Sequence, residues 1–110
     1  MDETAAVAGF AALANATRLK LFRLLIAAGP EGLAAGRLAE ALEISPSNLS
    51  AHLAALSRAG LVAGRAEGRA RIYAVDMGRA GALVRYLVED CCQGRPEVCA
   101  PVLDAAAPRC

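Results

Sequence analysis

The sequence has no cysteine before position 91, a single histidine and no apolar run long enough to cross a membrane. A spanning helix needs about 18 or more apolar residues in succession, so none is predicted. The first six residues, M-D-E-T-A-A, are acidic rather than basic, which argues against a secretory signal peptide. We therefore expect a cytoplasmic protein with no membrane partner.

A strong charge of either sign is also missing, because the formal net charge of the 110 residues is +1. Such a chain does not bind nucleic acid through bulk electrostatics, so DNA binding would depend on locally placed arginines. The sequence contains no C-x-x-C pair and no glycine-rich phosphate-binding loop. These absences argue against an enzyme, and we expect no organic cofactor.

What the chain has in abundance is alanine and leucine, within a hydrophobic content of 56%. This composition favours helices over strands. A chain of this length holds one domain and buries roughly two-thirds of its unfolded surface. The sequence therefore predicts a mainly α fold that is stable without disulfide bonds.

The most informative segment is S-P-S-N-L-S-A-H-L-A-A-L-S-R-A-G, residues 45–60. Ser45 can cap a helix, Pro46 suits its first position and Gly60 suits the residue past its end. One face of this helix is apolar and carries Leu49, Leu53 and Leu56. The opposite face is polar, without carboxylates, and carries Ser47, Asn48, Ser50 and His52. Such a helix can lie against DNA bases, although an ordinary surface helix has the same pattern.

Three further helices are predicted before this segment, at about residues 4–14, 18–28 and 36–42. The apolar face of the first is expected at Val7, Phe10, Ala11 and Leu13. Glu43-Ile44 forms a short turn between the third helix and residues 45–60. Two helices joined by such a turn form a helix-turn-helix, whose second helix enters the major groove.

After Gly60 the pattern changes to the period of two that is typical of strands. Residues 61–66 and 69–75 are predicted as strands, with a turn at Glu67-Gly68. This hairpin carries three arginines, Arg65, Arg69 and Arg71. A solvated ribbon would account for any one of them. Directly behind a helix-turn-helix, however, a basic hairpin indicates a wing that contacts the phosphate backbone.

Residues 78–92 are predicted as a last helix with a wide apolar surface. Because a small core cannot cover that surface, we expect a two-fold dimer interface shared with the first helix. The predicted architecture is a dimeric winged helix-turn-helix. Residues 1–92 form its DNA-binding and dimerisation domain, and residues 93–110 form a cysteine-containing tail.

These segments resemble the ArsR/SmtB family of winged-helix, metal-responsive transcriptional repressors. The resemblance covers about residues 5–92 and rests on A-N-A-T-R-L-K-L-F-R-L-L, S-P-S-N-L-S-A-H-L-A-A-L-S-R-A-G-L-V and G-R-A-E-G-R-A-R-I-Y-A-V. It implies a homodimer that binds a palindromic operator and releases it when an inducer binds. The residues that it implies for DNA contact are Ser47, Asn48, Ser50, His52, Arg69 and Arg71.

The chain departs from the family in its sensing residues. Many arsenic-responsive members carry a cysteine pair at or just before the recognition helix, where this chain has L-A-E-A-L-E-I-S-P-S. Zinc-responsive members use histidines and carboxylates on the last helix, but the single histidine here, His52, lies on the predicted DNA face. The sensing site must therefore lie elsewhere.

All four cysteines lie in the last fifth of the chain: Cys91, Cys92, Cys99 and Cys110. Clustered cysteines in a cytosolic protein are more often metal-binding or redox-active than structural. If the tail folds back, Cys91, Cys92 and Cys99 can converge as an all-sulfur set, which selects thiophilic ions. Structural zinc normally takes four ligands, so three thiolates suit arsenite or antimonite better. We therefore predict an arsenite-responsive repressor, similar to family members with cysteines at the end of the last helix.

Other interpretations remain open. A winged-helix repressor that senses thiol oxidation or reactive sulfur species would pair Cys99 with Cys91 or Cys92. Alternatively, Cys91 is a buried apolar residue of the dimer interface and the other cysteines are incidental. A small thiol-dependent arsenic-handling enzyme has the least support. Cys110 is either a spare thiol or a fourth ligand.

Overall fold

The structure is a computed structural model that describes residues 1–88, 97 and 100–102. Its elements in chain order are α1 (Glu3–Leu13), α2 (Ala16–Ala28), the 3-10 helix η1 (Gly29–Glu31), β1 (Leu33–Ala34), α3 (Ala35–Leu42), α4 (Pro46–Arg58), β2 (Val62–Glu67), β3 (Ala70–Val75) and α5 (Met77–Val88). The predicted mainly α fold with a small β-hairpin is confirmed. No helix in these residues is long and apolar enough to span a membrane.

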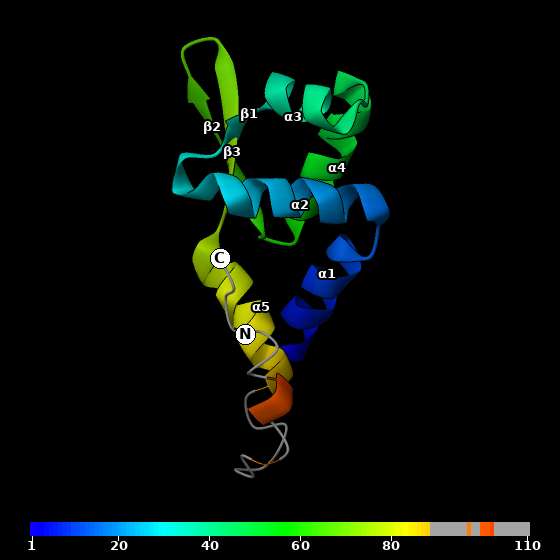
Figure 1. Cartoon of the computed structure of the whole chain (residues 1–110), viewed down its shortest axis with the longest axis vertical. Helices are drawn as coiled ribbons and strands as arrows, with labels where there is room; N and C mark the ends of the chain where they lie inside the picture. The colour runs from blue at the N-terminus through cyan, green and yellow to red at the C-terminus, as the bar shows by residue number, and fades with distance from the viewer. Residues whose placement is uncertain (89–96, 98–99, 103–110) are drawn as a thin grey trace.

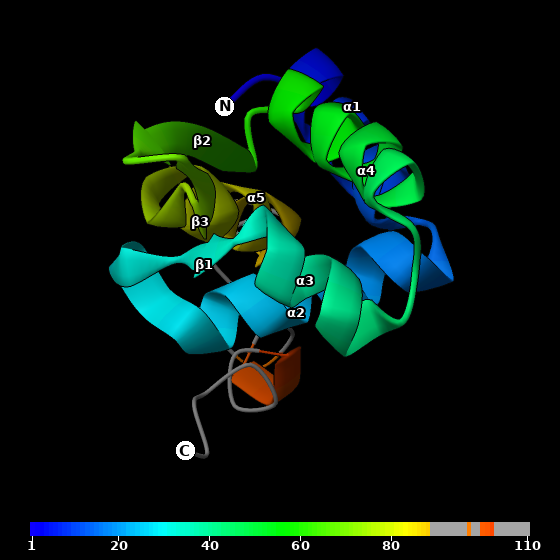
Figure 2. The same ribbon diagram turned by 90° about the horizontal axis from the view of Figure 1, so that it is seen from above.

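The elements are stacked along the long axis of the molecule, with α2 lying across its middle (Figure 1). The tip of the β2–β3 hairpin, α3 and the start of α4 lie at one end. Helices α1 and α5 extend toward the opposite end. The view from above shows the sheet beside the α3–α4 pair, with α2 beneath α3 (Figure 2). We call the β2–β3 hairpin the wing.

Side-chain caps fix where α1, α2 and α4 begin. The side chain of Asp2 accepts a hydrogen bond from the backbone N–H of Ala5 at 2.7 Å. In the same way Asn15 accepts from Arg18 N–H at 3.0 Å, and Ser45 accepts from Asn48 N–H at 3.1 Å. Each bond satisfies a donor that has no partner inside its own helix. Pro46 occupies the first turn of α4, and Gly60 follows its end with φ of +76°. The boundaries predicted for this helix are therefore confirmed.

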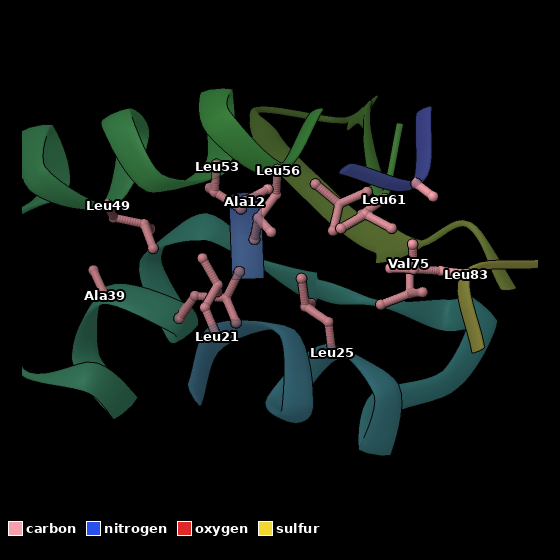
Figure 3. Packing of buried hydrophobic residues seen from close by; sticks show 13 residues of the cluster. Ala12, Leu21, Leu25, Ala39, Leu49, Leu53, Leu56, Leu61, Val75 and Leu83 are labelled. Carbon is pink, nitrogen blue, oxygen red and sulfur yellow. The ribbon is translucent and has the colours of Figure 1, made fainter. Parts of the chain in front are cut away.

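The core forms where α2 and α4 face each other (Figure 3). Its largest fully buried side chains are Leu21, Leu25, Leu38, Leu49, Leu56 and Leu61. The predicted stripe of α4 is fully confirmed, because Leu49, Leu53 and Leu56 are all buried. Burying a leucine side chain contributes about 1.5–3 kcal/mol, so this stripe holds α4 firmly in one rotational setting.

Helix α1 buries only part of the face that was predicted: Phe10 and Leu13 are partly buried against the core, as expected. Val7 and Ala11 are exposed, whereas the buried positions are Ala6, Gly9 and Ala12. The reason is the close approach of α5, since a Cβ at position 9 would lie 3.0 Å from Leu83 Cδ1. Gly9 therefore lies against Leu83 of α5, and the larger Val7 is exposed to solvent.

The sheet is three-stranded and antiparallel, with the order β1-β3-β2. Strand β1 was not predicted, because two residues are too few to show a periodicity. Leu33 pairs with Tyr73 on one side of β3, and Gly64 pairs with Tyr73 on the other. Gly32, just before β1, has φ of +72° and packs directly against the backbone carbonyl of Tyr73.

Replacing Gly32 by alanine should destabilise the fold. A Cβ there would overlap the Tyr73 carbonyl, and the positive φ adds backbone strain. We expect the free energy of unfolding to fall by about 2–4 kcal/mol, measured by urea denaturation. Gly36→Ala is the matched control, because nothing lies within 4 Å of its Cβ position in α3. That variant should be at least as stable as the wild type, and equal losses in both variants would refute the steric argument.

Candidate nucleic-acid interface

Helix α4 exposes short side chains on the side away from its buried leucines, with Ala51 and Ala54 exposed among the polar residues. Ser47, Asn48 and Ser50 are exposed on this side, as predicted, and the helix carries no acidic residue. The short connection from α3 is shaped by Glu43, whose φ of 55° is left-handed, and by a hydrogen bond from Ile44 N–H to the Ala39 carbonyl. The two helices thus form a helix-turn-helix whose second helix can enter a major groove.

His52 lies only partly on this exposed side. Its side chain is half-buried, and Nδ1 is buried without a hydrogen-bond partner among the residues that the structure describes. Nδ1 is therefore not accessible to an outside partner. The sequence predicts His52 on the DNA face, and the structure places it half-buried beside the exposed residues of that face.

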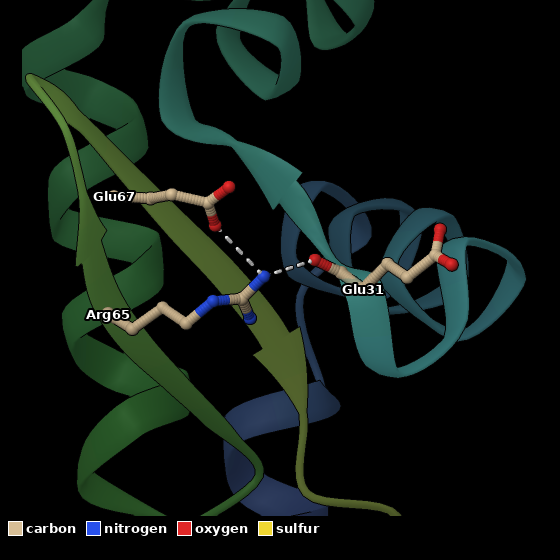
Figure 4. A network of polar contacts seen from close by, with 3 residues as sticks. All are labelled: Glu31, Arg65 and Glu67. Carbon is tan, nitrogen blue, oxygen red and sulfur yellow. Dashed lines mark hydrogen bonds and ion pairs between the residues drawn. The ribbon is translucent and has the colours of Figure 1, made fainter.

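Arg65 and Arg71 lie on opposite faces of the wing and have different contacts. Alternate residues of a strand point to opposite faces, so Arg71 shares a face with Tyr73 and the buried Val75. Arg65 is engaged within the protein itself: its Nη2 donates to the Glu31 carbonyl oxygen at 2.8 Å and to Glu67 Oε2 at 3.4 Å (Figure 4). This arginine ties the wing to η1, and the exposed ion pair adds little stability.

Arg69 and Arg71, by contrast, are exposed near the tip of the wing. Arg69 follows the turn residue Gly68, whose φ is +62°. Neither side chain takes part in a hydrogen bond or ion pair within the described residues. Their charges are therefore free for an anion such as a DNA phosphate.

The start of α4 and the tip of the wing lie at the same end of the molecule (Figure 1). A helix that contacts bases and a basic hairpin that contacts phosphates can thus engage one duplex together. Of the predicted DNA residues, Ser47, Asn48 and Ser50 lie in the first turns of α4, and Arg69 and Arg71 lie at or beside the turn of the wing. One signal in the sequence was not used for the prediction: Arg71 and Tyr73 have an i, i+2 spacing, which places a cation and an aromatic ring on one strand face.

The opposite end of the molecule is apolar at its surface. Val7 of α1 is 60% exposed, and Val84 and Leu87 of α5 are 53% and 57% exposed. Tyr86 adds a further exposed ring on α5. The uncovered apolar surface predicted for the last helix is therefore present through Val88, and its predicted remainder to residue 92 lies outside the described residues.

The predicted metalloid ligands Cys91, Cys92 and Cys99, and the spare Cys110, also lie outside the described residues. Within residues 1–88, 97 and 100–102, no group of three or more His, Cys, Asp or Glu side chains can hold a metal ion. The described part of the chain thus carries the candidate DNA interface, and the predicted metalloid site lies outside the described residues.

Comparison with known proteins agrees with this geometry. Residues 13–65 match a family described as a helix-turn-helix domain. The chain is 37% identical to the transcriptional activator HlyU of Vibrio cholerae over 82 residues, which are 74% of this chain and 73% of HlyU. It is 42% identical over 66 residues to a Halobacterium salinarum protein assigned as the arsenical resistance operon repressor ArsR, covering 60% of this chain and half of that protein.

Solved structures show the same fold. Reduced HlyU from Vibrio cholerae superposes with a TM-score of 0.63 at 34% identity, covering 73% of this chain and 82% of that one. The homodimeric winged helix-turn-helix DNA-binding domain of Mb0332 from Mycobacterium bovis gives a TM-score of 0.63 at 33% identity, covering 79% and 81%. These relatives are transcriptional regulators rather than enzymes. The chain belongs to the ArsR family of winged helix-turn-helix transcriptional regulators.

Proposed function

We propose that the protein is an arsenite- or antimonite-responsive repressor that binds operator DNA as a homodimer and leaves it when thiolates bind the metalloid. The observation that carries this proposal is that the candidate DNA-binding residues and the cysteines lie in different parts of the chain. The described residues 1–88 hold a polar recognition helix and a basic wing but no cysteine, and every cysteine follows the described end of α5.

Contact with DNA is assigned to Ser47, Asn48, Ser50, His52, Arg69 and Arg71. The short polar side chains of α4 meet base edges in the major groove, where hydrogen bonds discriminate between base pairs. Arg69 and Arg71 meet the phosphate backbone, which positions the protein without selecting a sequence. Their exposure and their free charges support this division.

The homodimer is assigned to the exposed apolar surface of α1 and α5. Val7, Val84 and Leu87 together would cost free energy if they stayed in water, and a second copy offers the same surface. The homodimeric Mb0332 domain, similar over 79% of this chain, supports the assignment. A two-fold dimer sets the distance between its two recognition helices, and half-sites about one helical turn apart tolerate little change in it.

The inducer is assigned to Cys91, Cys92 and Cys99. Three thiolates without a histidine suit a thiophilic ion, and the ArsR relative from Halobacterium salinarum is named for arsenical resistance. Because these cysteines follow α5, a metalloid held there would act on the helix that joins the protomers. A coupling of about 1–3 kcal/mol per site is ordinary for allostery and suffices for release.

The alternative is a regulator that senses thiol oxidation or reactive sulfur species. One solved structure of the relative HlyU is that of the reduced protein, and this supports the alternative. The same cysteines would then form a disulfide, Cys99 with Cys91 or Cys92, in place of a metalloid complex.

Alanine substitutions test whether α4 contacts bases while Arg69 and Arg71 contact phosphates. Arg69→Ala and Arg71→Ala should weaken binding to any duplex and flatten the dependence of log K on log[salt] by about 0.9 for each phosphate that is no longer neutralised. Ser50→Ala should instead reduce discrimination between DNA sequences. Arg65→Ala is the charge-matched control, because Arg65 is held by Glu31 and Glu67. Fluorescence anisotropy at several salt concentrations measures both effects, and a flatter slope for Arg65→Ala alone would contradict the assignment.

The dimer assignment predicts that Leu87→Glu and Val84→Glu produce monomers, because a carboxylate cannot be buried unpaired in an apolar interface. Sedimentation velocity measures the association state. Ile26→Glu is the control, since Ile26 is an exposed apolar residue of α2, a helix outside the proposed interface. The variant of α2 should remain dimeric. A dimeric Leu87→Glu protein would show that the interface lies elsewhere.

The inducer assignment predicts that arsenite, added under strong reductant, releases the wild-type protein from DNA but not Cys92→Ser or Cys99→Ser. Cys110→Ser serves as the control and should respond like the wild type. Release of DNA is followed by anisotropy of a labelled duplex. Unchanged release from both variants would refute the site, and release by oxidant alone would favour the redox alternative.

A further inference from the structure

Tyr73 occupies the centre of the small sheet and is fixed there by both of its neighbours. It pairs with Leu33 of β1 and with Gly64 of β2. Its backbone carbonyl packs against Gly32, and its side chain is partly buried against the core. The ring therefore has a defined position at the base of the exposed part of the wing.

Gly64 leaves room for that ring. A Cβ built at Gly64 would lie 2.8 Å from Tyr73 Cε1 and 3.0 Å from Arg71 Nε. The side chains of Tyr73 and Arg71 thus lie close over the backbone of β2 at Gly64. Any other residue at position 64 would bring its Cβ too close to them. Glycine weakens a strand interior, and one reason for its presence is such a close approach.

The guanidinium of Arg71 lies over the ring of Tyr73. Its Cζ lies 5.9 Å from the centroid of Tyr73, within the range of a cation–π interaction. A guanidinium placed over a ring keeps its N–H donors available at its edge. Arg69 lies on the same wing, but the structure gives it no comparable ring contact within the described residues.

We propose that Gly64 and Tyr73 form a platform that holds Arg71 ready for a DNA phosphate, so that Tyr73 is a positioning residue for DNA binding. The inference rests on the proposed contact of Arg71 with DNA. An arginine that is free in solution loses side-chain entropy when it binds, whereas a stacked arginine has lost part of it already. The platform therefore raises affinity without touching DNA and without adding charge.

A double-mutant cycle tests this with the full chain and a duplex of arbitrary sequence at low salt, because phosphate contacts do not depend on sequence. Tyr73→Ile should weaken binding about two- to fivefold for each wing, the magnitude of an exposed cation–π contact. The salt slope should stay unchanged, since Arg71 is still present. In the Arg71→Ala background, Tyr73→Ile should have no further effect. Tyr73→Phe keeps the ring and should bind like the wild type.

The outcomes separate the two proposals. If Arg71→Ala leaves both affinity and salt slope unchanged, the contact of Arg71 with DNA is wrong, and the platform falls with it. If Arg71→Ala weakens binding but Tyr73→Ile has the same effect in both backgrounds, the contact stands and the platform is refuted. Circular dichroism verifies folding. Should Tyr73→Ile fail to fold, Gly64→Ala, which pushes the ring and Arg71 off β2, decides the question in the same two backgrounds.

Discussion

The burial of one leucine stripe determines what the rest of the molecule can do. Leu49, Leu53 and Leu56 lock α4 against the leucines of α2, and this packing fixes which side of α4 faces water. The polar face is therefore presented as a rigid surface. A recognition helix needs such rigidity, because hydrogen bonds to base edges discriminate only when their donors and acceptors are held in place.

The same packing connects the two ends of the molecule through very few residues. Leu61, which is fully buried, donates from its N–H to the Leu56 carbonyl at the end of α4. Its own carbonyl accepts from the N–H of Asp76, which caps α5 by accepting from Arg79 N–H. The end of the recognition helix and the start of α5 are thus two backbone hydrogen bonds apart. A change in the setting of α5 has a short, stiff path to α4.

Local signals predicted much of this arrangement. Ser45, Pro46 and Gly60 mark the ends of α4 by backbone chemistry alone, and period-two alternation marks the wing. What could not be predicted depends on contacts between distant segments. The buried face of α1 is set by Leu83 of α5, and Arg65 donates a hydrogen bond to the backbone of Glu31, which is 34 residues away in sequence. The candidate DNA residues were therefore found by pattern, but their separate roles needed the packing.

The central claim is that residues 1–88 bind DNA and that the cysteines after them control this binding. The most direct test compares the full chain with a chain that ends at Val88, which keeps the buried core and lacks all four cysteines. Both are titrated onto one labelled duplex, with and without arsenite under reductant. The account predicts that both bind with the same salt dependence and that arsenite releases only the full chain. Equal release of the two chains, or no release of either, would contradict it.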